Sequence, residues 1–124
     1  MGSRLVSTRH TIEQWVELFN TGDAEGISAL YAEDAVNHQI ALEPVVGRAA
    51  IEQFHRDTFA GGPLTCTPIN LVVDGEWGAL EWVDPDGFRG CGFFQVRDGS
   101  IVAQRGYWDS AQLQEAHPDM HGSG

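Results

Sequence analysis

Basic residues, cysteines and long apolar runs are all scarce in this 124-residue sequence, and each scarcity excludes a class of protein. Seven Lys and Arg stand against 18 Asp and Glu, and the net charge of −11 disfavours binding to nucleic acid or to anionic membrane surfaces. No segment approaches the roughly 20 apolar residues of a membrane span. The first ten residues contain no apolar signal region, so we expect a cytoplasmic protein.

The two cysteines, Cys66 and Cys91, have a spacing that matches no zinc or redox motif. We expect reduced thiols, with a disulfide between neighbouring strands as the alternative. The sequence shows no P-loop, dinucleotide fingerprint or cluster of metal ligands, so we expect no cofactor and no metal. With 42% hydrophobic residues, the composition is typical of a single globular domain over 1–124.

Apolar residues at helical spacing predict three helices in the first half of the chain. The first begins at a cap among Ser7, Thr8 and Thr11 and ends at 20–22. Asp23 caps a short second helix, whose apolar face is predicted to include Leu30 and Tyr31. A short strand at 35–40 and a loop at 41–47 separate it from a third helix that carries 50–59.

Extended segments at 64–73, 77–83, 88–96 and 101–108 follow, and each turn between them contains Asp-Gly. Asp-Gly between extended runs is a strong hairpin signal, so we predict an antiparallel meander. Helices before strands indicate an α+β fold with the helices on one face of the sheet. Phe93 and Phe94 must point to opposite faces. Because both faces are apolar, we expect a homodimer in which a second subunit covers the face without helices.

Three motifs, at 19–35, 47–51 and 105–109, resemble the nuclear transport factor 2-like superfamily, and its SnoaL-like branch most of all. The resemblance covers about residues 8–113, which implies a core over that range and a tail at 114–124. It implies a cone in which three N-terminal helices pack on a strongly bent antiparallel sheet that encloses a pocket. Members include polyketide cyclases, ketosteroid isomerases and limonene epoxide hydrolases. Other members bind or scaffold without chemistry, so the fold alone does not settle the function.

Asn37 and Gln39 share one face of the short strand, and His38 takes the other. The resemblance places a pocket-lining Asn of the cyclases at Asn37. It places the water-holding Tyr and Asn of the epoxide hydrolases at positions 37 and 39. The isomerases have their general base near Gln39, but an amide cannot take a proton from carbon. We expect Asn37 and Gln39 to anchor a ligand; the alternative is a pair of structural amides bonded to strand backbone.

Asp84 matches the general acid of the epoxide hydrolases, whereas Trp82 replaces their Arg and Gly106 replaces their second Asp. The cyclases also have an Asp near Gly106. A carboxyl group beside Trp82 would be desolvated, and such a group can act as a general acid or base. The simpler alternative is that Asp84 only opens the turn at 84–87, where Asp is favoured.

Alternation along the later strands puts further aromatic and amide side chains on one face with Gly90, Gly92 and Gly106. These glycines would widen a cavity or let the sheet bend. The resemblance implies a small hydrophobic, oxygenated substrate and isomerase, cyclase or hydrolase chemistry, with Asp84 catalytic. The predicted substrate-binding residues are Asn37, Gln39, Trp82, Phe94, Gln104 and Trp108. The alternatives are a binding protein without catalysis and a structural dimerisation module.

Overall fold

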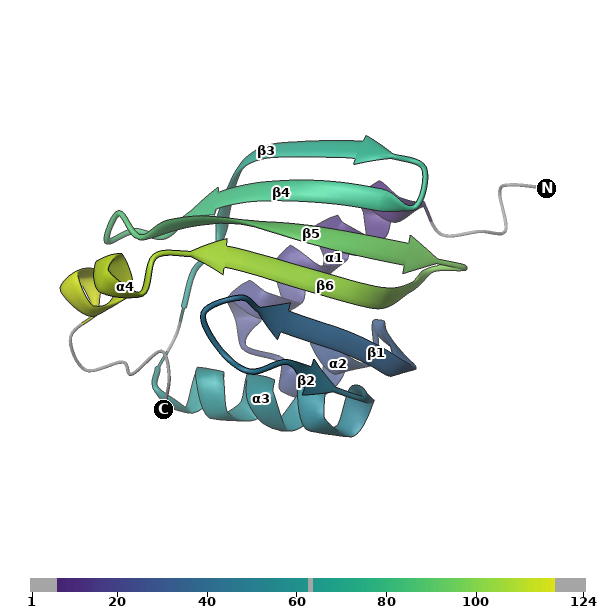
Figure 1. Ribbon diagram of the computed structural model, residues 1–124, viewed down its shortest axis with the longest axis horizontal. Helices are drawn as coiled ribbons and strands as arrows, with labels where there is room; N and C mark the ends of the chain where they lie inside the picture. The colour runs from purple at the N-terminus through teal and green to yellow at the C-terminus, as the bar shows by residue number, and fades with distance from the viewer. Residues whose placement is uncertain (1–6, 63, 118–124) are drawn as a thin grey trace.

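The architecture is a layer of helices against one curved sheet, which is the predicted α+β class. The computed structural model describes residues 7–62 and 64–117. Its elements in chain order are α1 (Thr8–Thr21), α2 (Ala24–Ser28), β1 (Tyr31–Gln39), β2 (Val45–Val46), α3 (Arg48–Ala60), β3 (Thr67–Asp74), β4 (Trp77–Val83), β5 (Arg89–Arg97), β6 (Ser100–Trp108) and α4 (Ser110–Ala116). Figure 1 shows α1 to α3 along one side of the sheet and α4 at its end.

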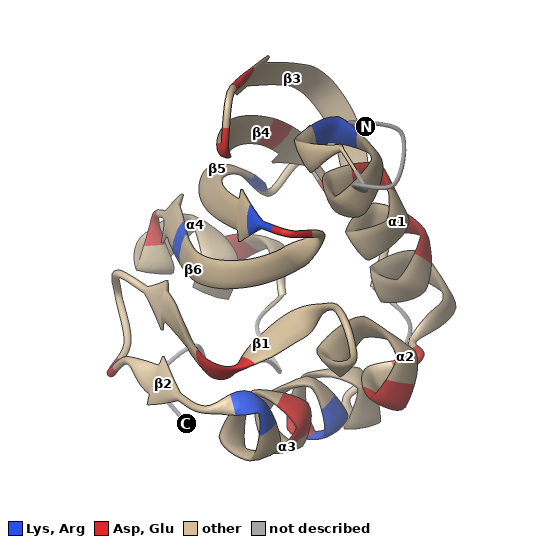
Figure 2. Ribbon diagram, turned by 90° about the vertical axis from the view of Figure 1, so that its right-hand side faces the viewer, with Lys and Arg blue, Asp and Glu red and all other residues tan. Residues whose placement is uncertain are grey.

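The six strands form one sheet in the order β2-β1-β6-β5-β4-β3. The strands β3 to β6 pair antiparallel in sequence order, which confirms the predicted meander, whereas β1 pairs parallel with β6. The β5–β6 hairpin turns at Asp98 and Gly99, with φ values of 54° and 81°, which Gly adopts without strain and Asp at modest cost. Figure 2 shows the sheet curling towards the helices.

The core lies between α1 and the helix-facing side of the sheet, which carries Leu80 and Phe94 and which we call the inner face. The helix α1 begins at the earliest predicted cap, because the Ser7 hydroxyl accepts a hydrogen bond from the His10 amide at 3.0 Å. Its apolar stripe is buried, and the Trp15 ring meets the Phe94 ring edge-on with centroids 5.2 Å apart. Packing therefore holds α1 across β4 and β5.

The boundary between α2 and β1 differs from the prediction. Tyr31 was predicted on the second helix, but it begins β1, which starts before the expected residue 35. Its side chain is fully buried, and its hydroxyl is hydrogen-bonded to Trp15 and to Gln104. These tertiary contacts outweigh the helical spacing. The predicted loop at 41–47 also contains a strand, because β2 pairs with β1.

A fourth helix, α4, crosses the predicted border between core and tail at 113. The Asp109 carboxylate caps it by accepting a hydrogen bond from the Ala111 amide at 2.8 Å. Leu113 is buried, and the Gln112 side chain accepts a bond from the Arg89 amide at 3.0 Å. The three-helix prediction therefore holds for the N-terminal part only.

Two smaller findings concern the thiols and the helix lengths. Cys66 and Cys91 are free, as expected, and burial raises the pKa of the Cys66 thiol to about 12. Between residues 7 and 117, leaving out 63, no helix combines the length and apolar character needed to cross a membrane.

Candidate functional site

All six residues predicted to bind substrate project from the inner face, because residues aligned across neighbouring strands point to the same side of a sheet. The pairing register arranges them in three rows, which are Phe94–Gln104–Asn37, Gly92–Gly106–Gln39 and Trp82–Gly90–Trp108. The first row is buried, whereas Gln39, Trp82 and Trp108 are each partly exposed. The inner face therefore has a closed end and an open end.

The closed end is a chain of hydrogen bonds within the protein. The Trp15 indole donates to the Tyr31 hydroxyl at 2.9 Å, and that hydroxyl donates to the Gln104 side-chain oxygen. Burial raises the pKa of Tyr31, with a smaller opposing effect from the Trp15 hydrogen bond, so the hydroxyl is neutral and free to donate. The Gln104 oxygen is thereby engaged with the protein itself.

The Gln39 side chain bridges β1 to the last strand. Its Nε2 donates to Asn37 Oδ1 at 2.8 Å, and its Oε1 accepts from the Trp108 indole at 2.8 Å. A Cβ atom at Gly106 would lie 1.9 Å from Gln39 Oε1, so only glycine at that position leaves room for this amide. Asn37 and Gln39 thus bond to side chains rather than to strand backbone.

The inner-face glycines do not simply widen a cavity, which corrects that part of the prediction. Gln39 takes the space opened by Gly106, and the Trp82 ring lies 2.4 Å from where a Cβ of Gly90 would stand. Gly92 differs, because the nearest atom to its Cβ position is a backbone oxygen at 3.4 Å. Two of the three glycines therefore make room for side chains of the predicted site.

An aromatic wall forms the open end. The Phe88 ring lies between the two tryptophans, with centroids 5.2 Å from Trp82 and 6.0 Å from Trp108. Phe88 is buried, and its only distinguishing feature in the sequence is its place after the turn at 84–87. The wall lies beside the Gln39 amide, because the Trp108 indole contacts both.

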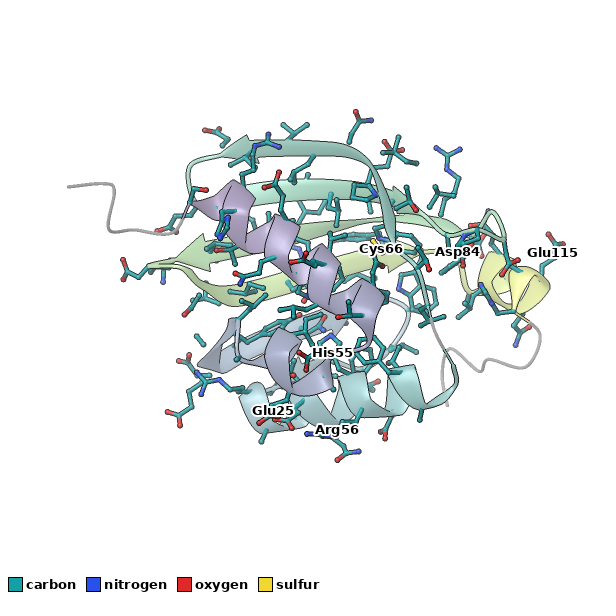
Figure 3. The ribbon with its side chains drawn as sticks, turned by 180° about the vertical axis from the view of Figure 1, so that it is seen from behind. Glu25, His55, Arg56, Cys66, Asp84 and Glu115 are labelled. Atoms are coloured by element: carbon teal, nitrogen blue, oxygen red, sulfur yellow. The ribbon has the colours of Figure 1, made fainter. Side chains whose placement is uncertain are left out.

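Asp84 is held at the same end by both of its carboxylate oxygens. Oδ1 accepts hydrogen bonds from the backbone amides of Asp86 and Phe88, each at 2.9 Å, which is the turn-opening role considered from the sequence. Oδ2 lies 2.5 Å from His117 Nε2, and the His117 ring packs against Phe88. Figure 3 shows Asp84 beside α4, far from the buried His55.

Sequence reasoning missed His117, which lies in the predicted tail at 114–124 and 33 positions from its partner Asp84. Local spacing cannot reveal a pair that forms only when α4 docks on the turn at 84–87. His38 lies on the side opposite Asn37, as expected, and its Nε2 is 3.2 Å from the Leu42 carbonyl oxygen.

Two of the surface hollows among the described residues contain no predicted site residue. One, of about 440 Å³, is lined by Gly22, Asp23, Ala24, Glu25, Arg56, Phe59 and Ala60. The other, of about 270 Å³, is lined by Arg9, Glu13, Val16, Pro68, Leu71 and Leu80. An enclosed pocket over the inner face stays a prediction.

The side of the sheet opposite the helices, which we call the outer face, is apolar and exposed. Trp77, Phe93 and Tyr107 keep 38%, 37% and 40% of their surface in solvent. The Arg105 guanidinium lies over two of these rings, 5.2 Å from the Trp77 centroid and 5.9 Å from that of Phe93. This face is a candidate contact surface rather than a site for chemistry.

Residues 12–104 match the profile of a protein family described as the SnoaL-like domain. That match spans most of the chain, from the first turns of α1 to the middle of β6.

Solved structures with the same fold carry several descriptions. An LEH-like epoxide hydrolase from M. tuberculosis superposes with a TM-score of 0.77 at 20% identity, over 88% of this chain and 87% of that one. A candidate polyketide cyclase from Xanthomonas campestris pv. campestris gives 0.75 at 25% identity, over 87% and 92%. A nuclear transport factor 2-like protein of unknown function from Cytophaga hutchinsonii gives 0.75 at 13%, over 87% and 95%.

Proposed function

The chain belongs to the SnoaL-like domain family, and we propose that it binds a small hydrophobic, oxygenated molecule against the open end of the inner face. We further propose that it transforms this molecule by acid/base chemistry of the isomerase, cyclase or hydrolase type, without a cofactor. The observation that carries the proposal is the Gln39 amide, which lies beside an aromatic wall at the partly exposed end of the sheet.

The Gln39 amide has hydrogen-bonding capacity to spare. An amide nitrogen carries two hydrogens and its oxygen has two lone pairs, while Gln39 uses one of each for Asn37 and Trp108. A ligand carbonyl, epoxide or hydroxyl oxygen can therefore bond to Gln39 without breaking the bridge. Trp82 and Trp108 would cover the apolar part of the ligand.

Asp84 is the proposed acid/base at this end. Its side chain is 10% exposed and lies in the turn that follows the Trp82 strand. The adjoining His117 gives a route for the proton, because its Nε2 lies 2.5 Å from Asp84 Oδ2. The description of one similar structure as a candidate polyketide cyclase is in keeping with such chemistry.

The second candidate is a binding protein without turnover. Two observations favour it, because both oxygens of Asp84 are already engaged and position 106 is glycine, with the space taken by Gln39. This candidate would bind the same ligands on the same surface as the proposed enzyme, but it would form no product from them.

Binding and turnover can be tested separately with a panel of cyclic ketones, epoxides and polyketide-like esters. Quenching of tryptophan fluorescence should report binding, because Trp82 and Trp108 wall the site. Gln39→Ala should weaken binding about tenfold, as expected for the loss of one buried hydrogen bond. The matched control is Gln95→Ala, since the Gln95 side chain bonds to the exposed Glu76 rather than to the inner-face residues.

Product formation by the wild type that falls in Asp84→Asn would support the enzyme. Binding without product across the panel would favour the second candidate. Equal affinities of the wild type and Gln39→Ala for every bound compound would contradict the proposed site.

We also propose that a second copy of the chain covers the outer face. The exposed Trp77, Phe93 and Tyr107 form an apolar centre. Arg105 and Glu81 lie on the same face in different rows, so a two-fold arrangement can set Arg105 of one copy against Glu81 of the other.

A further inference from the structure

The strongest unassigned feature is a cluster of three metal-ligating side chains at the end of the sheet. It consists of Asp84 and Asp86 in the β4–β5 turn and His117 at the end of α4. One ligand atom from each residue lies within 4.8 Å of the other two. We propose that these side chains bind a divalent transition-metal cation, Zn²⁺ or Mn²⁺.

The β4–β5 turn orients both carboxylates. Asp84 Oδ1 accepts hydrogen bonds from the Asp86 and Phe88 amides, and these two bonds fix the orientation of the carboxylate. Its Oδ2 therefore points towards α4. Gly87 has a φ of 88° and completes the turn. The Asp-x-Asp spacing therefore presents two carboxylates to α4 from a backbone that is already ordered.

The helix α4 brings the third ligand from the other side. Asp109 caps its start, Leu113 is buried, and the His117 amide donates to the Leu113 carbonyl at 2.8 Å. His117 Nε2 is consequently 2.5 Å from Asp84 Oδ2 and 3.7 Å from Asp86 Oδ2. Two donors on one ion at ~2.1 Å are about 3 to 3.5 Å apart, so small side-chain rotations would suffice.

The local charge also favours a cation. Among the described residues, the ion pairs of Asp84 and Asp86 involve His117 and no arginine, and the nearby Arg89 is paired with Glu81 at 3.6 Å. Two carboxylates with one neutral imidazole carry a charge of about −2, which a divalent ion neutralises. The imidazole nitrogen favours zinc, and the two carboxylates also suit manganese, whereas calcium and magnesium prefer all-oxygen sites.

This site shares Asp84 and His117 with the proposed acid/base group at the open end of the inner face, and it adds Asp86. A bound cation would hold Asp84 as an anion, so Asp84 could serve proton transfer only in the metal-free protein. The cation would tie α4 to the β4–β5 turn.

Isothermal titration of tag-free, EDTA-treated protein with zinc chloride and with manganese chloride tests the proposal. We expect one cation per chain and a rise in the melting temperature on saturation. Asp86→Asn and His117→Gln should each weaken binding at least tenfold. Asp86 is largely exposed, so its substitution should leave the fold intact. Asp98→Asn and His10→Gln are the matched controls and should bind as the wild type does.

Two results would overturn the assignment. One is the lack of saturable binding of either ion up to about 1 mM, which would leave a proton shared between Asp84 and His117 as the explanation of the cluster. The other is binding that neither Asp86→Asn nor His117→Gln weakens, which would place the ion elsewhere.

Discussion

At the residue scale, His55 shows how burial determines the protonation state of a side chain. It is 2% exposed, packs beside Tyr31 and Phe59, and its Nδ1 lies 3.0 Å from the Ile51 carbonyl oxygen. Burial lowers the pKa of His55 from 6.5 to about 4, and the Ile51 hydrogen bond opposes this shift only in part. His55 is therefore a neutral core residue at physiological pH.

This neutrality predicts a loss of stability in mild acid. Below pH 6.5 the unfolded chain gains a proton at His55, while the folded chain gains none until about pH 4. The free energy of unfolding should therefore fall between pH 8 and pH 5, by about 2 kcal/mol from this residue. Urea unfolding at the two pH values measures the difference. His55→Leu should reduce it and the exposed His10→Gln should not; equal pH dependence in all three proteins would contradict the assignment.

At the element scale, the strand boundaries were predictable where the turn chemistry is local. Asp98 and Gly99 mark a hairpin because their positive φ values suit only a few residue types. The first strand was not predictable from residue 31, since Tyr31 is held by Trp15 and by Gln104, which are 16 and 73 positions away. Alternation along the strands was enough to place the candidate site residues on one face of the sheet. The contact between Asp84 and His117 was not predictable, because it depends on how α4 docks.

The cap of α4 gives a prediction at this scale. Asp109→Ala removes the hydrogen bond to the Ala111 amide, a change that typically costs about 1 kcal/mol. Because α4 has only seven residues and lies at the end of the sheet, the effect should be local fraying. Hydrogen exchange should speed up at residues 111–117 and remain unchanged in β4 and β5. Ser110→Ala is the matched control, and the same exchange rates in both variants would refute the capping role.

At the scale of the whole molecule, the uncovered outer face predicts self-association. Light scattering on the wild type should give the mass of two chains. Phe93→Asp should give the mass of one, because it places a charge among Trp77, Tyr107 and their copies. Ala50→Asp, on the exposed side of α3, is the control and should remain a dimer. A wild type that stays monomeric at high protein concentration would show that the outer face has another role.

The parallel pairing of β1 with β6 determines when the sheet can finish folding during protein synthesis. On the ribosome, β1 emerges early, but its neighbour in the meander is β6, the last strand of the described residues. The Gln39 bridge to Trp108 spans 69 positions, so it cannot form before residue 108 has left the exit tunnel. Nascent chains that end before β6 would contain β1 to β5 but would lack the hydrogen bond between Gln39 and Trp108.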